Sequence, residues 1–281
     1  MKKKLKKENI ILSSLKESFK SAKKRLGLIA FLFLLQLIFL IILFALTVNY
    51  SFKIKDKMDL IFGYLEKQDL SGENVEKSVF QGNLLGDDPL IIHRNYTQII
   101  KNITLLSLFA LLSYIVINGL LWSFSDSIIN KKGIREFFIY FGRFSVVAGV
   151  FAGFTGVLLY KTLKSLAGSF MAGNILKFDF ASLLLFMLLL YFMYISFALI
   201  GKNRLIDIPK KAFFIGIKKA HIILIAYLIG LFFIALFSLS IGLAIELHIA
   251  MLIFAVILFV GSLVWARIFL VLVVSKARNQ I

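Results

Sequence analysis

The sequence contains no cysteine and two prolines, and 17% of its 281 residues are charged. The lack of cysteine excludes disulfides, thiolate catalysis, cysteine-bound zinc and iron–sulfur clusters. Soluble domains carry about 25% charged and about 45–50% apolar residues, whereas 60% of the residues here are hydrophobic. The composition therefore excludes a disordered chain, a disulfide scaffold and an ordinary soluble enzyme, and it indicates an integral membrane protein.

Six hydrophobic runs are long enough to cross a membrane, because a helix rises about 1.5 Å per residue and the hydrocarbon core is about 30 Å thick. Core helices of soluble proteins have shorter apolar runs and keep a polar stripe, whereas these runs are apolar all round. The sequence predicts an all-α bundle of six transmembrane helices. Their expected ranges are 27–48, 103–122, 139–160, 181–200, 221–244 and 249–274.

Charge is distributed unequally between the two sides of this predicted membrane protein. The side that holds both termini carries 23 of the 33 Lys and Arg residues and five of the 15 acidic ones, so it accounts for the whole net charge of +18. Basic residues stay cytoplasmic during insertion, which predicts a cytoplasmic N-terminus and a cytoplasmic tail over 275–281. Anionic lipid headgroups are the partners that this charge favours, and no nucleic-acid partner is predicted.

Three basic segments on the cytoplasmic side are predicted to form interfacial amphipathic helices. These segments are 1–26, 123–138 and 201–220. Each has apolar residues at helical spacing on one face and basic residues on the rest, a pattern typical of helices that lie in the headgroup plane. The apolar stripes are Ile11, Leu15, Phe19 and Ala22; Ile134, Phe137, Phe138 and Phe141; and Phe213, Ile217, Ala220 and Leu224.

Each segment leads into a span through a related pattern, which suggests three units of one interfacial helix and two spans. The patterns are Phe19-x-x-x-Lys23-Lys24, Phe138-x-x-x-Gly142-Arg143 and Phe214-x-x-x-Lys218-Lys219. True internal repetition and chance similarity under shared membrane constraints are both open explanations. The layout resembles prokaryotic six-span families such as the YciC-like proteins and the membrane domain attached to some glycerophosphodiesterases. That resemblance implies a plasma membrane and assigns no site residues.

Two segments on the opposite side are expected to be extracytoplasmic loops. Segment 49–102 is too short to bury much of a core, and it is predicted to form short helices that rest on the membrane surface. One of these would include Ile54 and Leu65, and another would begin after Ser71. Segment 161–180 is the second loop.

The sequence motifs of membrane enzymes are absent. There is no His-Glu-x-x-His, no Gly-x-Ser-x-Gly and no Walker-type phosphate loop, and His221 and His248 lie at opposite ends of one span. The chain is therefore predicted not to be an enzyme, and no catalytic, cofactor or metal site is predicted.

Two amides are the deepest strong hydrogen-bonding groups in the predicted spans. Gln36 lies in the first span and Asn118 in the second. Polar side chains at such positions commonly bridge neighbouring helices, and this role is favoured over lining a transport path.

Arg267 lies about two turns inside the cytoplasmic end of the last span. It could snorkel to the headgroups, pair with Asp207 or Asp126, or bind an anionic headgroup. Together with Arg143, at the start of the third span, Arg267 and Asp207 form the candidate lipid or ion-pair site.

Small and aromatic residues in the spans have predicted roles in packing and anchoring. Gly149, Gly153 and Gly156 give the third span a smooth face for close helix approach. Aromatic residues near span ends are typical interface anchors. These are Tyr50, Trp122, Tyr140, Tyr160 and Trp265.

The leading functional hypothesis is a non-catalytic membrane module whose basic face associates with anionic lipid and scaffolds a partner. The alternative is a permease or exporter of an apolar or anionic small molecule. Convergence of Gln36, Asn118 and Arg267 around a cavity would favour transport, whereas a closed bundle would favour the module. The substrate, the protein partner and the oligomeric state are not predictable from the sequence.

Overall fold

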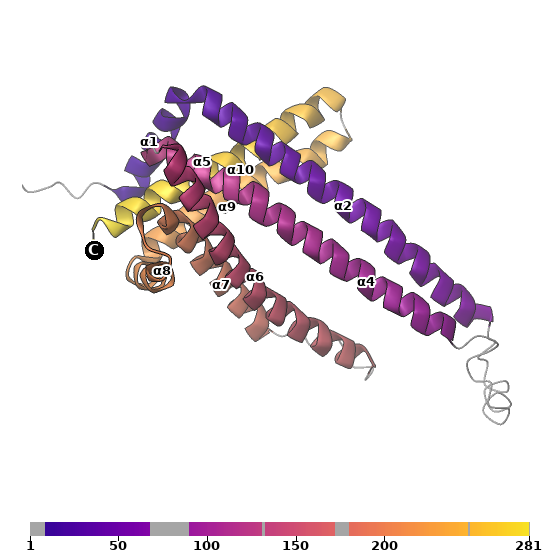
Figure 1. Cartoon of the computed structure of the whole chain (residues 1–281). Helices are drawn as coiled ribbons and strands as arrows, with labels where there is room; N and C mark the ends of the chain where they lie inside the picture. Colours follow the sequence, from indigo (N-terminus) through magenta and orange to yellow (C-terminus); the bar gives the residue numbers. More distant parts are fainter. Residues whose placement is uncertain (1–8, 68–89, 131–132, 172–179, 247, 281) are drawn as a thin grey trace, which may run out of the picture. The chain divides into compact units, whose positions relative to one another are not determined.

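The computed structural model describes residues 9–67, 90–130, 133–171, 180–246 and 248–280. All regular elements within these residues are helical, which confirms the all-α fold (Figure 1). The helices are α1 Ile10–Lys24, α2 Leu26–Lys67, α4 Leu90–Ser113, the π-helical η1 Tyr114–Asn118, α5 Gly119–Asn130, α6 Ile134–Met171, α7 Phe180–Leu199, the 3₁₀ turn η2 Ile200–Lys202, α8 Asp207–Lys218, α9 Ala220–Ile245 and α10 Ile249–Arg278.

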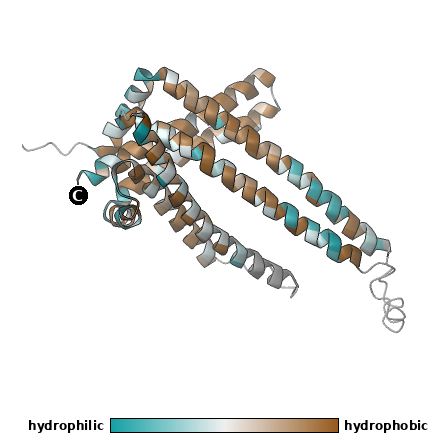
Figure 2. Cartoon of the chain, in the orientation of Figure 1, coloured by the Kyte–Doolittle hydropathy of each residue, from teal (hydrophilic) through white to brown (hydrophobic). Residues whose placement is uncertain are grey.

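Six helical stretches of the described chain are long and apolar enough to cross a membrane, one for each predicted span. In their most hydrophobic windows 17% to 28% of the residues are buried. Many exposed residues of these helices are large and apolar, and Figure 2 shows that hydrophobic residues predominate along the helices. Water would penalise such a surface, whereas lipid accepts it. The chain is a multi-pass membrane protein. The spans are Leu26–Tyr64, Leu90–Asn130, Ile134–Thr162, Phe180–Leu199, Ala220–Ile245 and Ile249–Arg278.

The chain divides into two compact units. The first consists of Met1–Ile38 and Ile115–Ile281, and the second is Phe39–Tyr114. The first unit contains α1, the start of α2, and α5 to α10, whereas the second contains the remainder of α2 together with α4.

The C-terminal half of α10 forms the core of the first unit. Every residue from Ile268 to Val274 is buried, because α1, α5, α7 and α9 all pack against this helix. A helix that is buried all round needs apolar residues on every face, and this run of Ile, Phe, Leu and Val provides them.

The predicted interfacial helix over 123–138 is not a separate helix. Residues 123–130 continue the second spanning helix as α5, and α6 begins at Ile134 and runs on into the third span. The hydroxyls of Ser123 and Ser125 are buried within α5, where they donate to backbone carbonyls four residues earlier at 2.7 Å. These polar side chains therefore do not end the helix. The middle one of the three proposed units lacks the interfacial helix of the other two.

The segments predicted to be extracytoplasmic loops are also more helical than predicted. Helix α2 runs for 42 residues, about 63 Å, because no Pro or Gly interrupts residues 49–62. Residues 90–102 begin α4, and α6 extends to Met171. Short surface helices are therefore the wrong description of 49–67 and 90–102, while the predicted cap at Ser71 lies outside the described residues.

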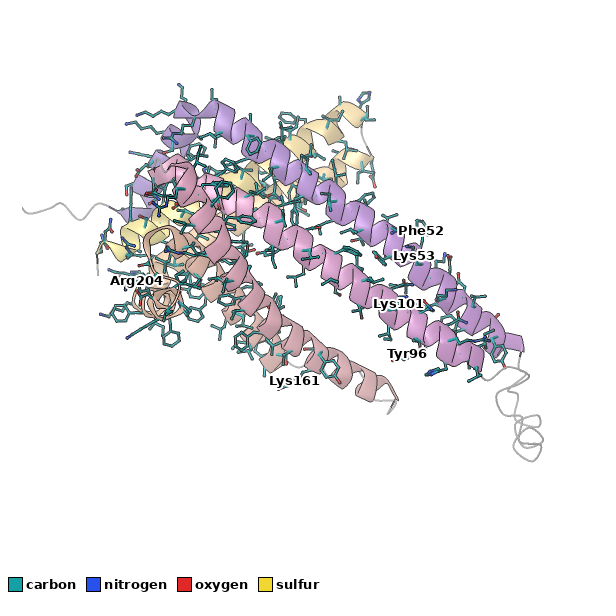
Figure 3. All side chains as sticks on the ribbon, in the orientation of Figure 1. Phe52, Lys53, Tyr96, Lys101, Lys161 and Arg204 are labelled. Carbon is teal, nitrogen blue, oxygen red and sulfur yellow. The ribbon has the colours of Figure 1, made fainter. Side chains whose placement is uncertain are left out.

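In the second unit, aromatic contacts join α2 to α4 and to Tyr114, the first residue of η1. The ring centroids of Tyr50 and Phe109 are 6.4 Å apart, and so are those of Phe39 and Tyr114. Tyr50 is buried at 7% exposure, so it does not act as the predicted interface anchor. Figure 3 labels four exposed residues of this unit: Phe52 and Lys53 on α2, and Tyr96 and Lys101 on α4.

Candidate functional site

The first predicted amphipathic segment contains a separate helix, α1, and polar contacts fix it to α10; its position at the membrane interface stays a prediction. Lys276 Nζ lies 2.8 Å from Glu17 Oε2 and donates to Ser13 Oγ at 3.1 Å. Eleven residues before Lys276 on α10, Trp265 Nε1 donates to Ser18 Oγ at 3.0 Å. These contacts bring the two terminal helices to the same end of the first unit.

Helix α1 has three faces with different roles. Of the predicted apolar stripe, Phe19 is more than half exposed, as expected for a side chain in the acyl boundary, whereas Ile11 and Leu15 pack against the protein core. The lysines are exposed, as expected, and so is Leu12. The third face, with Ile10, Ser14 and Ser18, is buried against α9 and α10. Small hydroxyl side chains suit this face because they let helices approach closely.

The segment 201–220 contains a separate helix, α8, as predicted, and α8 also has one exposed and one buried apolar face; its position at the membrane interface stays a prediction. Phe213 and Ile217 are more than half exposed, whereas the opposite apolar face is buried and packs on α7. Gly216 lies on the buried face, and its carbonyl accepts a 2.8 Å hydrogen bond from Tyr191 Oη. On the outer side, Lys218 Nζ lies 4.3 Å from the ring centroid of Phe214.

The exposed lysines of α1 and α8 form a surface that we call the basic face. Its members are Lys16, Lys20, Lys23 and Lys24 of α1 and Lys210, Lys211 and Lys218 of α8. Helix α1 meets the last turns of α10, where Lys276 contacts Glu17, whereas α8 packs mainly on α7. The residue after α8, Lys219, donates a 3.4 Å hydrogen bond to Gln280, which follows α10. Figure 2 shows hydrophilic residues on α1, on α8 and at the end of α10.

The arginine cluster consists of Arg267, Gln36 and Asn118, which come from three different helices. Arg267 Nη2 donates to Gln36 Oε1 at 3.1 Å and to Asn118 Oδ1 at 3.2 Å. The three side chains lie at similar depth, since each is 11 or 12 residues from Arg25, Asn130 or Arg278 at its helix end, about 17 Å along the axis. The predicted helix-bridging role of the two amides is therefore realised through Arg267.

The amides of this cluster are enclosed by protein. Gln36 is 4% exposed and Asn118 is 6% exposed, and Asn118 Nδ2 has no hydrogen-bond partner among the described residues. Asn118 is the last residue of the π-helical turn η1. Such turns shift the angular position of the following side chains and are frequent at functional sites.

A side pocket of about 170 Å³ lies next to the arginine cluster. Among the described residues that line it, Arg267 is the one with a charge, and the rest are aromatic, aliphatic or small. The guanidinium carbon of Arg267 is 5.7 Å from the centroid of the Trp122 ring, within the range of a cation–π interaction. The lining residues are Trp122, Tyr194, Ala226, Tyr227, Gly230, Leu231, Ile234, Leu263, Ala266, Arg267 and Leu270.

Arg143 and Asp207 lie in a different cluster. Arg143 Nη1 donates to the backbone oxygen of Asn203 at 2.7 Å, and Lys211 Nζ donates to Asn203 Oδ1 at the same distance. Asp207 Oδ2 lies 4.0 Å from Lys211 Nζ in an exposed pair. The predicted site of Arg267, Arg143 and Asp207 is therefore divided between two places.

Several residues near the arginine cluster were missed or misassigned from the sequence. Trp122 and Tyr140 are each 2% exposed and are not interface anchors; Tyr140 Oη donates to the Phe197 carbonyl at 2.6 Å. Asp126, which falls in the predicted interfacial helix over 123–138, is also 2% exposed. Tyr140 lies within electrostatic range of both Asp126 and Arg267. No sequence signal separates such buried aromatics from interfacial ones.

The glycines that pack against other helices are not the predicted ones. A Cβ built on Gly149, Gly153 or Gly156 would meet no atom of the described residues within 4 Å, so the predicted packing face on α6 is exposed. A Cβ on Gly119 would instead lie 2.8 Å from Phe141 Cε2, and one on Gly216 would lie 2.8 Å from Phe192 Cε1.

Neither a protein-family model, nor a curated protein, nor a solved structure matches the chain. The layout-level resemblance to the YciC-like and glycerophosphodiesterase-associated membrane domains therefore stays a prediction.

Proposed function

We propose that the chain is a non-catalytic plasma-membrane module whose basic face associates with anionic lipid on the cytoplasmic side. One observation supports this most strongly: α1 is docked on α10 and α8 is docked on α7, and both helices keep their lysines exposed. The basic face is thereby held in one orientation toward the headgroups.

The neighbouring apolar residues support the same proposal. Leu12 and Phe19 on α1, and Phe213 and Ile217 on α8, are more than half exposed beside these lysines. Apolar side chains enter the acyl boundary while lysines contact phosphates, and each basic residue near the surface contributes about 1 kcal/mol with anionic lipid. A surface of this kind also suits a scaffold for an acidic protein partner.

Lipid retention by the purified protein tests the proposal. The protein is extracted in mild detergent from membranes of mixed phosphatidylcholine and phosphatidylglycerol, and bound lipids are counted by native mass spectrometry. Glutamine at Lys16, Lys20, Lys23 and Lys24 should reduce phosphatidylglycerol retention several-fold, because four phosphate contacts are lost.

A control variant removes four lysines of the second unit instead: Lys53, Lys55, Lys57 and Lys101. This variant should retain phosphatidylglycerol as the parent does. Equal losses in the two variants would show that total charge, and not the basic face, determines lipid association.

A permease of an apolar or anionic small molecule is the second candidate. The convergence of Gln36, Asn118 and Arg267 beside a pocket favours it, because permeases place polar groups within the membrane where substrates pass. Uptake into proteoliposomes that depends on Arg267 would support this candidate over the module.

A further inference from the structure

We propose that a second pocket, at the start of α6, binds the phosphoethanolamine headgroup of a membrane lipid. The inference goes beyond the association of anionic lipid with the basic face. It concerns a different site, and a headgroup that carries one positive and one negative charge.

This second pocket, which we call the α6 pocket, has a volume of about 220 Å³ and lies between the first turns of α6 and the turn η2. An apolar cavity of about 150 Å³ accommodates one benzene molecule, so the α6 pocket has room for a small headgroup. The lining residues from α6 recur every three or four positions and therefore share one face of the helix. The described lining residues are Glu136, Ile139, Tyr140, Arg143, Ile200 and Gly201.

Two side chains of opposite charge line the α6 pocket. Glu136 and Arg143 lie seven residues apart on one helix, about 10 Å along its axis, whereas charged pairs on a helix form at a spacing of three or four residues. Neither of the two forms an ion pair with any described residue. The α6 pocket therefore offers one cation and one anion to a ligand that carries both charges.

Arg143 is held in place and keeps donors for a ligand. Among the described residues its one hydrogen bond is the 2.7 Å bond from Nη1 to the backbone oxygen of Asn203. None of its nitrogens is buried without a partner, so the donors that make no bond are accessible. A guanidinium has five N–H donors and binds phosphate oxygens in pairs. Arg143 can therefore bind a phosphate without giving up its bond to Asn203.

Asn203 fixes the position of this guanidinium. It is 7% exposed, and its Nδ2 donates to the Leu199 carbonyl at 2.8 Å. A side chain fixed before the ligand arrives loses little conformational freedom on binding, which favours affinity. Asn203 is thus a positioning residue for Arg143.

Glu136 favours a primary ammonium group over a quaternary one. It lies in the first turn of α6, and its side chain is exposed. An ionised carboxylate only accepts hydrogen bonds, and a primary ammonium has three N–H donors, whereas the trimethylammonium of phosphatidylcholine has none. Charge-assisted hydrogen bonds of this kind are about twice as strong as neutral ones. The α6 pocket should therefore prefer phosphatidylethanolamine to phosphatidylcholine.

The order of these groups along α6 matches the order of groups in the lipid. Glu136 is near the beginning of the spanning stretch Ile134–Thr162, and Arg143 lies farther into it. In phosphatidylethanolamine the phosphate is likewise closer to the acyl chains than the ammonium is. Val146 and Val150, three and seven residues after Arg143, are 50% and 54% exposed and continue the same side of the helix. An acyl chain can lie against them while the headgroup occupies the pocket.

Lipid titration by native mass spectrometry tests this proposal. The purified protein in mild detergent is titrated separately with phosphatidylethanolamine and phosphatidylcholine of identical acyl chains, and the affinity for the first bound lipid is measured. Phosphatidylethanolamine should bind several-fold more tightly. The two lipids have the same net charge, so general attraction to the basic face does not produce this difference.

Two substitutions and two controls assign the preference to the α6 pocket. Glu136→Gln should bring the affinities for the two lipids close to equal, and it removes no ion pair with a described residue. Arg143→Gln should weaken phosphatidylethanolamine binding about tenfold. Asp207→Asn and Arg204→Gln remove charges from the same unit that do not belong to the described lining. Both controls should leave the preference unchanged, and Arg204 is visible beside α8 in Figure 3.

Three results would overturn the proposal. The first is equal affinity of the unsubstituted protein for the two lipids, a comparison that does not depend on the folding of a variant. The second is an unchanged preference in Glu136→Gln. The third is displacement of the lipid by an equal concentration of free phosphoethanolamine, which would assign the site to a soluble ligand. Glutamine at the four lysines of α1 should lower phosphatidylglycerol retention and keep this preference, so failure at the basic face is distinguishable from failure here.

Discussion

The indole N–H of Trp265 donates a 3.0 Å hydrogen bond to the hydroxyl of Ser18, although the two residues are 247 positions apart. This bond joins the first helix of the chain to the last one, at the edge of the core cluster that contains Ile10, Phe269 and Val273. Because α1 is fixed to α10 in this way, its lysines project from a defined position and not from a helix held by lipid alone.

Ser18→Ala should loosen α1. The substitution removes one oxygen, the acceptor of the Trp265 N–H, which costs about 1–2 kcal/mol when a buried donor is left unpaired. Hydrogen–deuterium exchange over residues 10–24 should become faster. Ser14→Ala is the control, because Ser14 is equally buried and its Oγ has no hydrogen-bond partner among the described residues. Faster exchange in the control as well would show that the hydrogen bond does not hold the helix.

Gly119→Ala and Gly216→Ala should each destabilise the first unit. The added Cβ would lie 2.8 Å from a phenylalanine ring carbon in both cases, and overpacking of this kind typically costs about 1–3 kcal/mol. The melting temperature of the purified variants checks this expectation. Gly153→Ala is the matched control, since its Cβ would meet no described atom within 4 Å and alanine is the better helix former. A lower melting temperature for Gly153→Ala would show that the α6 glycines pack after all.

Arg267→Met should destabilise the protein by about 1–3 kcal/mol, because the buried oxygens of Gln36 and Asn118 lose their donor. Adding Gln36→Leu and Asn118→Leu should restore part of this loss, since the two amides left without their donor are then replaced by apolar groups, while the other interactions of Arg267 stay lost. Denaturant unfolding of the single and triple variants provides the comparison. Losses that add across the three positions would contradict coupling within the arginine cluster.

The six spans were predictable because crossing a hydrocarbon core requires about 20 apolar residues, and sequence alone reveals such runs. The end of a span was less predictable. Trp122 and Ser123 suggested an exit from the membrane, but α5 continues to Asn130 with its serine hydroxyls bonded within the helix. Polar residues such as Ser123 end the apolar run in the sequence, but they do not end the helix.

Packing faces were the least predictable feature, and the membrane is the reason. In water the most apolar face of a helix is buried, whereas in lipid it can remain exposed, as Phe19 and Phe213 are. The buried faces are instead recognised by small residues such as Ser18 and Gly216. Gly153 is equally small, but no described atom lies within 4 Å of a Cβ built on it. A small residue therefore permits a second helix to approach closely, but it does not show that a helix does so.

Of the candidate site, the sequence identified the three polar members of the arginine cluster but not their direct contact. Whether residues 36, 118 and 267 meet depends on the rotation of three helices about their axes, and the π-helical turn that ends at Asn118 sets one of these rotations. Hydrophobic periodicity cannot resolve such a turn.

Accessibility of introduced cysteines tests most directly the central claim that the basic face lies on the cytoplasmic side. The chain has no cysteine of its own, so Lys55→Cys in the second unit and Lys210→Cys in α8 each create a single reactive site at an exposed position. A membrane-impermeant maleimide should label position 55 in intact cells, and it should label position 210 after the membrane is permeabilised. Labelling at position 210 in intact cells, with position 55 protected, would reverse the orientation and place the basic face outside.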